Sequence, residues 1–217
     1  LAVVKLPAIR PSPSPDPLFF LAGGPGQSAI QTINAVEGSL NSIQKERDII
    51  FVDQRGTGNS NPLSCDFPET DPATMGSDDS TERHLAVLKA CIEDWNVDAR
   101  YFGTSFAARD LEAVRKELEL NSINLYGVSY GTRLAQVYMR LFPESTRSVV
   151  LDGVVPMDVP VGQDAASDAQ RVFDLLDEEC RKDETCFEVT PSIKEDLEKL
   201  VRLLEETETV LAHNPSS

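Results

Sequence analysis

The sequence has few basic side chains and only two histidines, His84 and His213. Its 20 Lys and Arg residues stand against 36 Asp and Glu residues, which gives a formal net charge of -16. Nucleic acids and anionic membranes bind basic surfaces, so this charge argues against both classes of partner. A free peptide amino terminus is cationic and would be tolerated or attracted.

Long apolar runs and metal-binding motifs are also missing. No apolar run reaches the roughly 18 residues that a membrane-spanning helix needs, so we expect no membrane span. The sequence contains no Cys-x-x-Cys motif and no Cys/His cluster, so we expect neither a metal site nor a cofactor. The length of 217 residues allows one domain and part of a second.

The four cysteines fall into two groups. Cys65 lies in an expected loop and Cys91 in the helix that follows it, while Cys180 and Cys186 bracket a short turn. We predict the disulfides Cys65–Cys91 and Cys180–Cys186, although four cysteines allow three pairings. Disulfides would indicate a secreted, periplasmic or otherwise oxidising location. The alternative is four free thiols in a cytoplasmic enzyme.

The most informative segment is Gly127-Val-Ser129-Tyr-Gly131, which matches the G-x-S-x-G nucleophile elbow of serine hydrolases. The elbow needs small residues around the serine because the entering strand and the leaving helix nearly touch there. Residues 122–126 have the pattern of a short buried strand, and residues 130–142 that of a helix. We therefore predict Ser129 as a nucleophile. The alternative is a glycine-bracketed turn with an incidental serine.

A second motif is the glycine-rich loop at residues 23–26, which follows the apolar strand expected at residues 18–22. Glycines let backbone N–H groups approach a developing oxyanion closely. We predict an oxyanion hole formed by the N–H groups of Gly24 and Tyr130. The alternative is a plain tight turn. The other residues expected to shape the loop are Gly23, Pro25 and Gly26.

A third apolar strand, residues 48–53, ends in Asp53-Gln-Arg55-Gly-Thr-Gly58-Asn-Ser60. An acidic residue and an arginine at the end of a buried strand can form a buried ion pair. We predict that Asp53 and Arg55 brace the strand ends beneath the site; direct participation in chemistry is the alternative.

In this order and spacing, the three motifs resemble the α/β-hydrolase superfamily. More narrowly, they resemble the proline iminopeptidase and secreted tripeptidyl aminopeptidase family of serine peptidases. The family's GGPG loop is similar to residues 23–26, its DQRGxGxS segment to residues 53–60, and its GxSYG elbow to residues 127–131. The resemblance covers roughly residues 1–160. It implies an α/β-hydrolase fold, a mostly parallel sheet wrapped by helices.

The alternation of strands and helices predicts the same architecture without the resemblance, and it places all three motifs at the carboxyl ends of strands. We expect residues 1–155 to be the N-terminal part of a catalytic domain. Residues 156–217 are expected to begin a helical cap, with one helix over residues 163–181. Ser192-Ile-Lys-Glu195 matches a capping box and predicts the start of another helix.

A complete catalytic triad is not evident in this chain. The acid and the histidine of this fold follow the nucleophile in sequence, whereas His84 precedes it and His213 lies in a polar terminal stretch. Asp152 follows a strand, but the resemblance places the acid on a later strand. We therefore expect the acid and base to lie outside this chain, in the remainder of a longer polypeptide.

The resemblance implies a serine peptidase that releases residues or short peptides from peptide amino termini. Two alternatives share the same motifs. One is a secreted esterase or lipase, because the elbow is common to many hydrolases. The other is a non-catalytic binding protein on a hydrolase scaffold, which the missing base favours and the intact elbow opposes.

Overall fold

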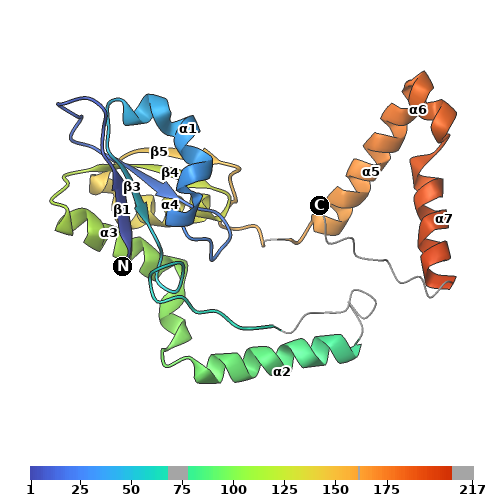
Figure 1. Ribbon diagram of the computed structural model, residues 1–217, viewed down its shortest axis with the longest axis horizontal. Helices are drawn as coiled ribbons and strands as arrows, with labels where there is room; N and C mark the ends of the chain where they lie inside the picture. Colours follow the sequence, from blue (N-terminus) through green and yellow to red (C-terminus); the bar gives the residue numbers. More distant parts are fainter. Residues whose placement is uncertain (68–77, 161, 207–217) are drawn as a thin grey trace. The chain divides into compact units, whose positions relative to one another are not determined.

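The computed structural model describes residues 1–67, 78–160 and 162–206 (Figure 1). These residues separate into two compact units, one within residues 1–159 and one within residues 160–206. The first unit contains β1 (Val3–Leu6), β2 (Leu18–Leu21), η1 (Ile30–Thr32), α1 (Ile33–Gln44), β3 (Ile49–Val52), α2 (Asp78–Asp94), η3 (Ala99–Phe102), α3 (Thr104–Glu117), β4 (Ile123–Val128), α4 (Tyr130–Leu141), η4 (Pro143–Ser145) and β5 (Thr146–Asp152). The second contains α5 (Ala165–Lys182), α6 (Glu184–Val189) and α7 (Ile193–Glu206).

The first unit is built on a sheet whose described strands follow the order β1-β3-β2-β4-β5. β1 is antiparallel to β3, and the other neighbouring strands are parallel. β2 and β3 are apolar and buried at every position, as expected for central strands covered on both faces. Leu21 pairs with Gly127, and Val128 pairs with Asp152. These registers bring the carboxyl ends of β2, β4 and β5 to one edge of the sheet.

Helices cover both faces of the sheet, as Figure 1 shows. On one face, Phe19 of β2 belongs to a buried cluster with Leu111 of α3 and Leu134 of α4. Phe20, the next residue along β2, points to the opposite face and shares a cluster with Leu40 of α1. This alternation is what a strand with two buried faces requires. It confirms the α/β architecture expected from the sequence.

β5 lies at the end of the sheet and, among the described residues, pairs only with β4. Two of its apolar side chains are exposed, Val150 at 48% and Leu151 at 36%. An edge strand of this kind presents unpaired backbone groups and apolar surface to any segment that can add to it.

A polar network centred on Asp16 holds the amino-terminal edge of the sheet. The buried Asp16 carboxylate accepts hydrogen bonds from Asn124 Nδ2 (2.8 Å) and Arg47 Nε (3.0 Å), and Arg147 Nε lies 3.2 Å from it. Ser148 donates to Asn124 Oδ1 at 2.6 Å. Burial acts to raise the pKa of Asp16, but the hydrogen bonds from Asn124 and Arg47 and the arginine charges bring it below the ordinary value. The network joins the segments that lead into β2 and β3 to the first residues of β4 and β5.

A second buried network lies between α3, α4 and η4. The Glu112 side chain accepts hydrogen bonds from Arg115 Nε (2.7 Å), the Tyr138 hydroxyl (2.9 Å) and the Ser145 hydroxyl (3.3 Å). The hydrogen bond from Arg115 lowers the pKa of Glu112 to about 2, against the opposing effect of burial. Burial in turn raises the pKa of Tyr138 to about 12.

Because the folded-state pKa of Glu112 lies below its ordinary value of 4.5, its ionised form stabilises the fold above pH 4.5. That contribution is lost as the pH falls through about 2. We expect Glu112→Gln to lower the free energy of unfolding at pH 7, and the deficit to shrink by roughly 3 kcal/mol towards pH 2. Urea unfolding of the wild type and of Glu112→Gln between pH 2 and 7 measures the deficit at pH 7 and its decrease towards pH 2. Glu37→Gln, at an exposed position on α1, is the control. A Glu112→Gln deficit in the free energy of unfolding that does not change with pH would contradict the lowered pKa of Glu112.

The second unit differs from the expected organisation at its first turn. The sequence predicted a short turn between Cys180 and Cys186. Instead, α5 continues to Lys182 and α6 begins at Glu184, because Asp183 caps α6 by accepting the Cys186 N–H at 2.8 Å. The expected turn was therefore too long, and the sequence analysis missed α6.

α7 begins where the capping-box pattern placed a helix start. The Ser192 hydroxyl accepts the Glu195 N–H at 3.4 Å and donates to the buried Asp177 of α5 at 3.0 Å. Arg181 completes this contact, with its Nη2 3.0 Å from Asp177 Oδ2. None of the helices in the described ranges has the length and apolar character that crossing a membrane requires.

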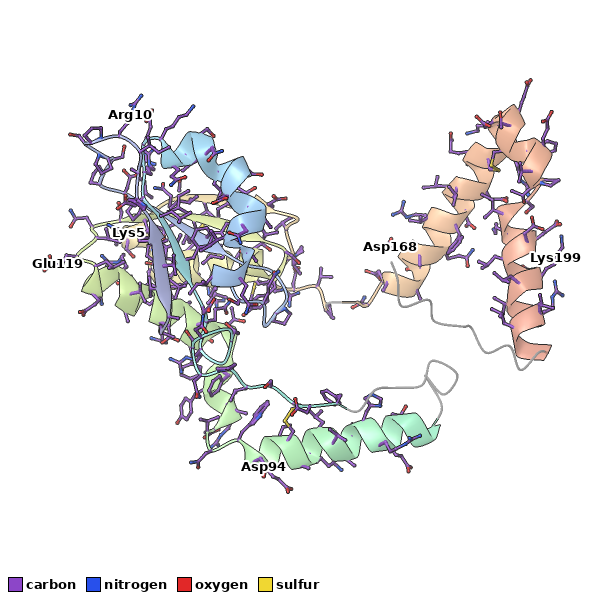
Figure 2. The ribbon with its side chains drawn as sticks, viewed as in Figure 1. Lys5, Arg10, Asp94, Glu119, Asp168 and Lys199 are labelled. Carbon is purple, nitrogen blue, oxygen red and sulfur yellow. A yellow bond between two sulfur atoms is a disulfide. The ribbon has the colours of Figure 1, made fainter. Side chains whose placement is uncertain are left out.

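All four cysteines form disulfides, and the pairings are those predicted from their grouping. Cys65–Cys91 joins the loop after β3 to α2, with its Cα atoms 5.7 Å apart (Figure 2). Cys180–Cys186 joins α5 to α6, with its Cα atoms 5.2 Å apart. Each unit thus contains one disulfide.

Candidate active site

Ser129 lies between β4 and α4, on the sharp turn expected of the G-x-S-x-G pattern. Its backbone has φ 52° and ψ -119°, a region that residues other than glycine rarely adopt. The flanking glycines make the turn possible. A Cβ at Gly127 would lie 2.5 Å from Gly131 O, and a Cβ at Gly131 would lie 2.1 Å from Leu21 O. The turn therefore packs backbone directly against backbone and holds the exposed Ser129 side chain at the carboxyl edge of the sheet.

Within residues 1–67, 78–160 and 162–206, no group forms a hydrogen bond with the Ser129 hydroxyl. His84 lies on α2 and stacks on Phe67, with ring centroids 5.8 Å apart. His213 lies outside the described residues. The described residues therefore bring no histidine to Ser129.

Asp152 ends β5 at the same edge of the sheet. Its backbone carbonyl accepts the Ser129 N–H at 2.9 Å. Its carboxylate accepts the Tyr126 hydroxyl at 2.8 Å, and this hydrogen bond raises the pKa of Tyr126. Asp152 thus contacts the Ser129 turn through its backbone, while its carboxylate is bonded to a tyrosine.

The glycine-rich loop after β2 lies against the Ser129 turn. Gly23 is buried, and a Cβ there would lie 3.4 Å from Ser129 Cβ. Gly24 and Gly26 are exposed and have φ of 98° and 103°, and the Gly24–Pro25 peptide bond is cis. These positive φ values explain why glycine occupies both positions.

Two backbone N–H groups near this turn are available to a ligand. Tyr130 is the first residue of α4, so its N–H precedes the intrahelical hydrogen bonds. In the described part of the chain, neither the Tyr130 N–H nor the Gly24 N–H has an acceptor. The Tyr130 side chain is held on α3, where its hydroxyl lies 2.9 Å from Thr104 Oγ1. The Ser129 turn and the glycine-rich loop thus each present one of these two N–H groups.

Asp53 holds the loops around the site, although not in the predicted way. Its side chain is fully buried at the end of β3. One carboxylate oxygen accepts the Ser28 hydroxyl (2.7 Å) and the Ile30 N–H (3.1 Å), and the other accepts the Asn59 N–H (2.9 Å). A Cβ at Gly58 would lie only 2.2 Å from Asp53 Oδ2. Asp53 therefore joins the far end of the glycine-rich loop to the loop after β3.

The predicted Asp53–Arg55 ion pair is wrong. Arg55 instead forms a two-point ion pair with Asp110 of α3, with Nε–Oδ2 and Nη2–Oδ1 both at 2.6 Å. Its Nη1 also donates to Tyr101 O at 3.0 Å. The physical reason is that neutral donors and the close Gly58 backbone already surround the Asp53 carboxylate. The partly exposed Asp110 is open to the wide guanidinium group.

Two residues at the site were not predicted from the sequence: Thr132, which contacts Ser129, and Thr104, which contacts Tyr130. A threonine by itself does not mark a functional position in a sequence. Thr132 follows the G-x-S-x-G pattern directly, and that position was the only available hint.

In the described part of the chain, no group of three His, Cys, Asp or Glu side chains is arranged to hold a metal ion.

Residues 16–185 match the sequence model of a family described as alpha/beta hydrolase fold. The chain is 31% identical over 160 residues to YuaR of Escherichia coli K12, which is named as a hydrolase. That alignment covers 73% of this chain and 31% of the relative. It is 34% identical over 151 residues to the tripeptidyl aminopeptidase of Streptomyces coelicolor, covering 64% and 28%. It is 28% identical over 204 residues to a serine protease of Mycobacterium tuberculosis, covering 86% and 38%.

The chain thus spans about a third of the length of these relatives. The family match covers most of the chain, including strands β2 to β5, the Ser129 turn and the glycine-rich loop. The fold, the motifs and this match agree, and the chain belongs to the alpha/beta hydrolase fold family.

Proposed function

We propose that this chain carries the nucleophile and oxyanion hole of a serine peptidase that cleaves residues or short peptides from peptide amino termini. Ser129 attacks the scissile carbonyl, and the Gly24 and Tyr130 N–H groups stabilise the resulting oxyanion. The observation that carries the proposal is an exposed serine on a positive-φ turn that packs against a glycine-rich loop. Among the described residues, the N–H groups of Gly24 and Tyr130 have no acceptor.

The triad acid and histidine come from polypeptide outside these 217 residues. Two observations support this part of the proposal. No described histidine bonds to Ser129, and the chain spans only about a third of its relatives' length. The exposed outer side of β5 offers a place where further polypeptide can add to the sheet.

The names of the relatives and the charge support the proposed substrate class. One relative is named a tripeptidyl aminopeptidase and another a serine protease. A net charge of -16 favours the approach of a cationic peptide amino terminus. The two disulfides support a location outside the cytoplasm, because disulfides persist in oxidising compartments.

The test uses the full-length protein and three chromogenic substrates. These are a tripeptide p-nitroanilide with a free amino terminus, its N-acetylated form, and p-nitrophenyl butyrate. We expect the free tripeptide anilide to be cleaved with a higher kcat/KM than its N-acetylated form, because the substrate amino terminus is recognised. Turnover of the butyrate ester without cleavage of either anilide would indicate an esterase instead. A fluorophosphonate probe should label Ser129, and failure to label would favour a non-catalytic binding protein.

A further inference from the structure

We propose that Thr132 is a positioning residue for the nucleophile. Its hydroxyl joins the Ser129 carbonyl to residues 153–159, the segment that leads away from the end of β5. The proposal rests on the proposed function, because it takes Ser129 as the nucleophile. Thr132 does not contact the reacting atoms; it acts by holding the backbone that carries them.

Thr132 is fully buried in the first turn of α4. Its hydroxyl donates to Ser129 O at 2.5 Å and accepts the Val155 N–H at 2.9 Å. A hydroxyl has one proton and two lone pairs, so both bonds form together. The Thr132 N–H also donates to Ser129 O, at 2.9 Å. One buried side chain therefore connects the nucleophile residue to Val155, which lies 23 residues beyond Thr132.

The Ser129 backbone needs such support because its φ is 52°. Unfavourable backbone conformations persist only where the surroundings hold them. The Ser129 N–H is held by Asp152 O at the end of β5, and the Ser129 carbonyl is held by Thr132. The backbone N–H and C=O groups of Ser129 are therefore both held by hydrogen bonds, the first to Asp152 and the second from Thr132.

Residues 153–159 are bound to α4 by two further side chains. Gln136 Nε2 donates to Val155 O at 3.1 Å, and Arg133 Nη2 donates to Pro156 O at 2.8 Å and to Val159 O. Of these α4 side chains, Thr132 is the one that also bonds to Ser129. Gln136 therefore provides a matched control, because its loss loosens the same segment without removing a bond to the nucleophile residue.

The experiment compares Thr132→Val, Thr132→Ser and Gln136→Met in the full-length protein. Thr132→Val keeps the shape but removes the hydroxyl, whereas Thr132→Ser keeps the hydroxyl. We expect Thr132→Val to slow fluorophosphonate labelling of Ser129 and to lower kcat, each by roughly ten- to a hundredfold, because small displacements of a reacting group are costly. KM should stay within about twofold, because ground-state binding is retained. Thr132→Ser and Gln136→Met should stay close to wild type.

Amide hydrogen exchange adds a readout that does not depend on activity. The Val155 N–H should exchange faster in Thr132→Val than in wild type, and Thr132→Ser should restore its protection. If Thr132→Val fails to fold, Thr132→Ala measured below its unfolding midpoint takes its place. Equal labelling rates in Thr132→Val and wild type would overturn the proposal, as would a Thr132→Ser variant as slow as Thr132→Val.

These outcomes separate this proposal from the proposed function. A wild-type protein whose Ser129 is not labelled by the probe overturns the serine-hydrolase function itself. The positioning role falls with it, and exchange at the Val155 N–H then reports only on the hydrogen bond between Thr132 and Val155. If the probe labels Ser129 at the same rate in the wild type and in Thr132→Val, only the proposed role of Thr132 is overturned.

Discussion

Replacing Ser129 with alanine is expected to abolish peptide hydrolysis by the full-length protein, with kcat falling by roughly a millionfold. The substitution removes the attacking oxygen and leaves the backbone N–H donors in place. Stability should change by less than about 0.5 kcal/mol, because the exposed hydroxyl has no hydrogen-bond partner among the described residues. Steady-state assays with a free tripeptide anilide and thermal unfolding measure the two effects.

Ser39→Ala is the matched control for this prediction, because Ser39 is an exposed serine on α1. Its activity and fluorophosphonate labelling should equal those of the wild type. If Ser129→Ala kept its amidase activity, the nucleophile would have to be another residue. If Ser129→Ala were inactive only because it had unfolded, its melting temperature would reveal this.

Gly131→Ala is expected to have the largest effect on folding. An added methyl group would lie 2.1 Å from the backbone oxygen of Leu21, the last residue of β2, and 2.8 Å from that of Ala22, the residue after it. Neither can move aside without displacing β2, so α4 would be forced away from the sheet. We expect a loss of more than about 4 kcal/mol in the free energy of unfolding, together with loss of the Ser129 turn. Chemical denaturation and near-UV circular dichroism test both.

Gly38→Ala is the matched control for the same substitution in a helix. Gly38 lies in α1, and an added Cβ there would have no atom within 4 Å. This variant should be stabilised by about 0.5–1 kcal/mol, because alanine favours the helix. Equal stabilities of Gly131→Ala and Gly38→Ala would show that the close contact between α4 and β2 does not constrain the fold.

The fold was predictable because its determinants are local in sequence. The apolar run at residues 18–22 predicted β2, and the strand pattern before Gly127 together with the helical pattern after Ser129 predicted β4 and α4. The family match confirms the fold class that these motifs indicated. The roles of Ser129, Gly24 and Tyr130 in catalysis stay predictions.

What the sequence could not supply were partnerships between distant residues. Arg55 was paired with its near neighbour Asp53, whereas its partner is Asp110, 55 positions further along. Thr132 was missed for the same reason, since its importance depends on Val155, which only the folded chain brings next to it. Local patterns predict which strand or helix forms, but side-chain partners across the sheet depend on packing that no local pattern contains.

The Asp16 network has a consequence for how this scaffold can change over evolution. It fastens the strands at their amino ends, whereas the Ser129 turn and the glycine-rich loop occupy the carboxyl ends. The strands are therefore held together at one edge of the sheet, and the proposed active site lies at the opposite edge. Loops at the carboxyl ends can be lengthened or exchanged while the Asp16 network keeps the strands in register.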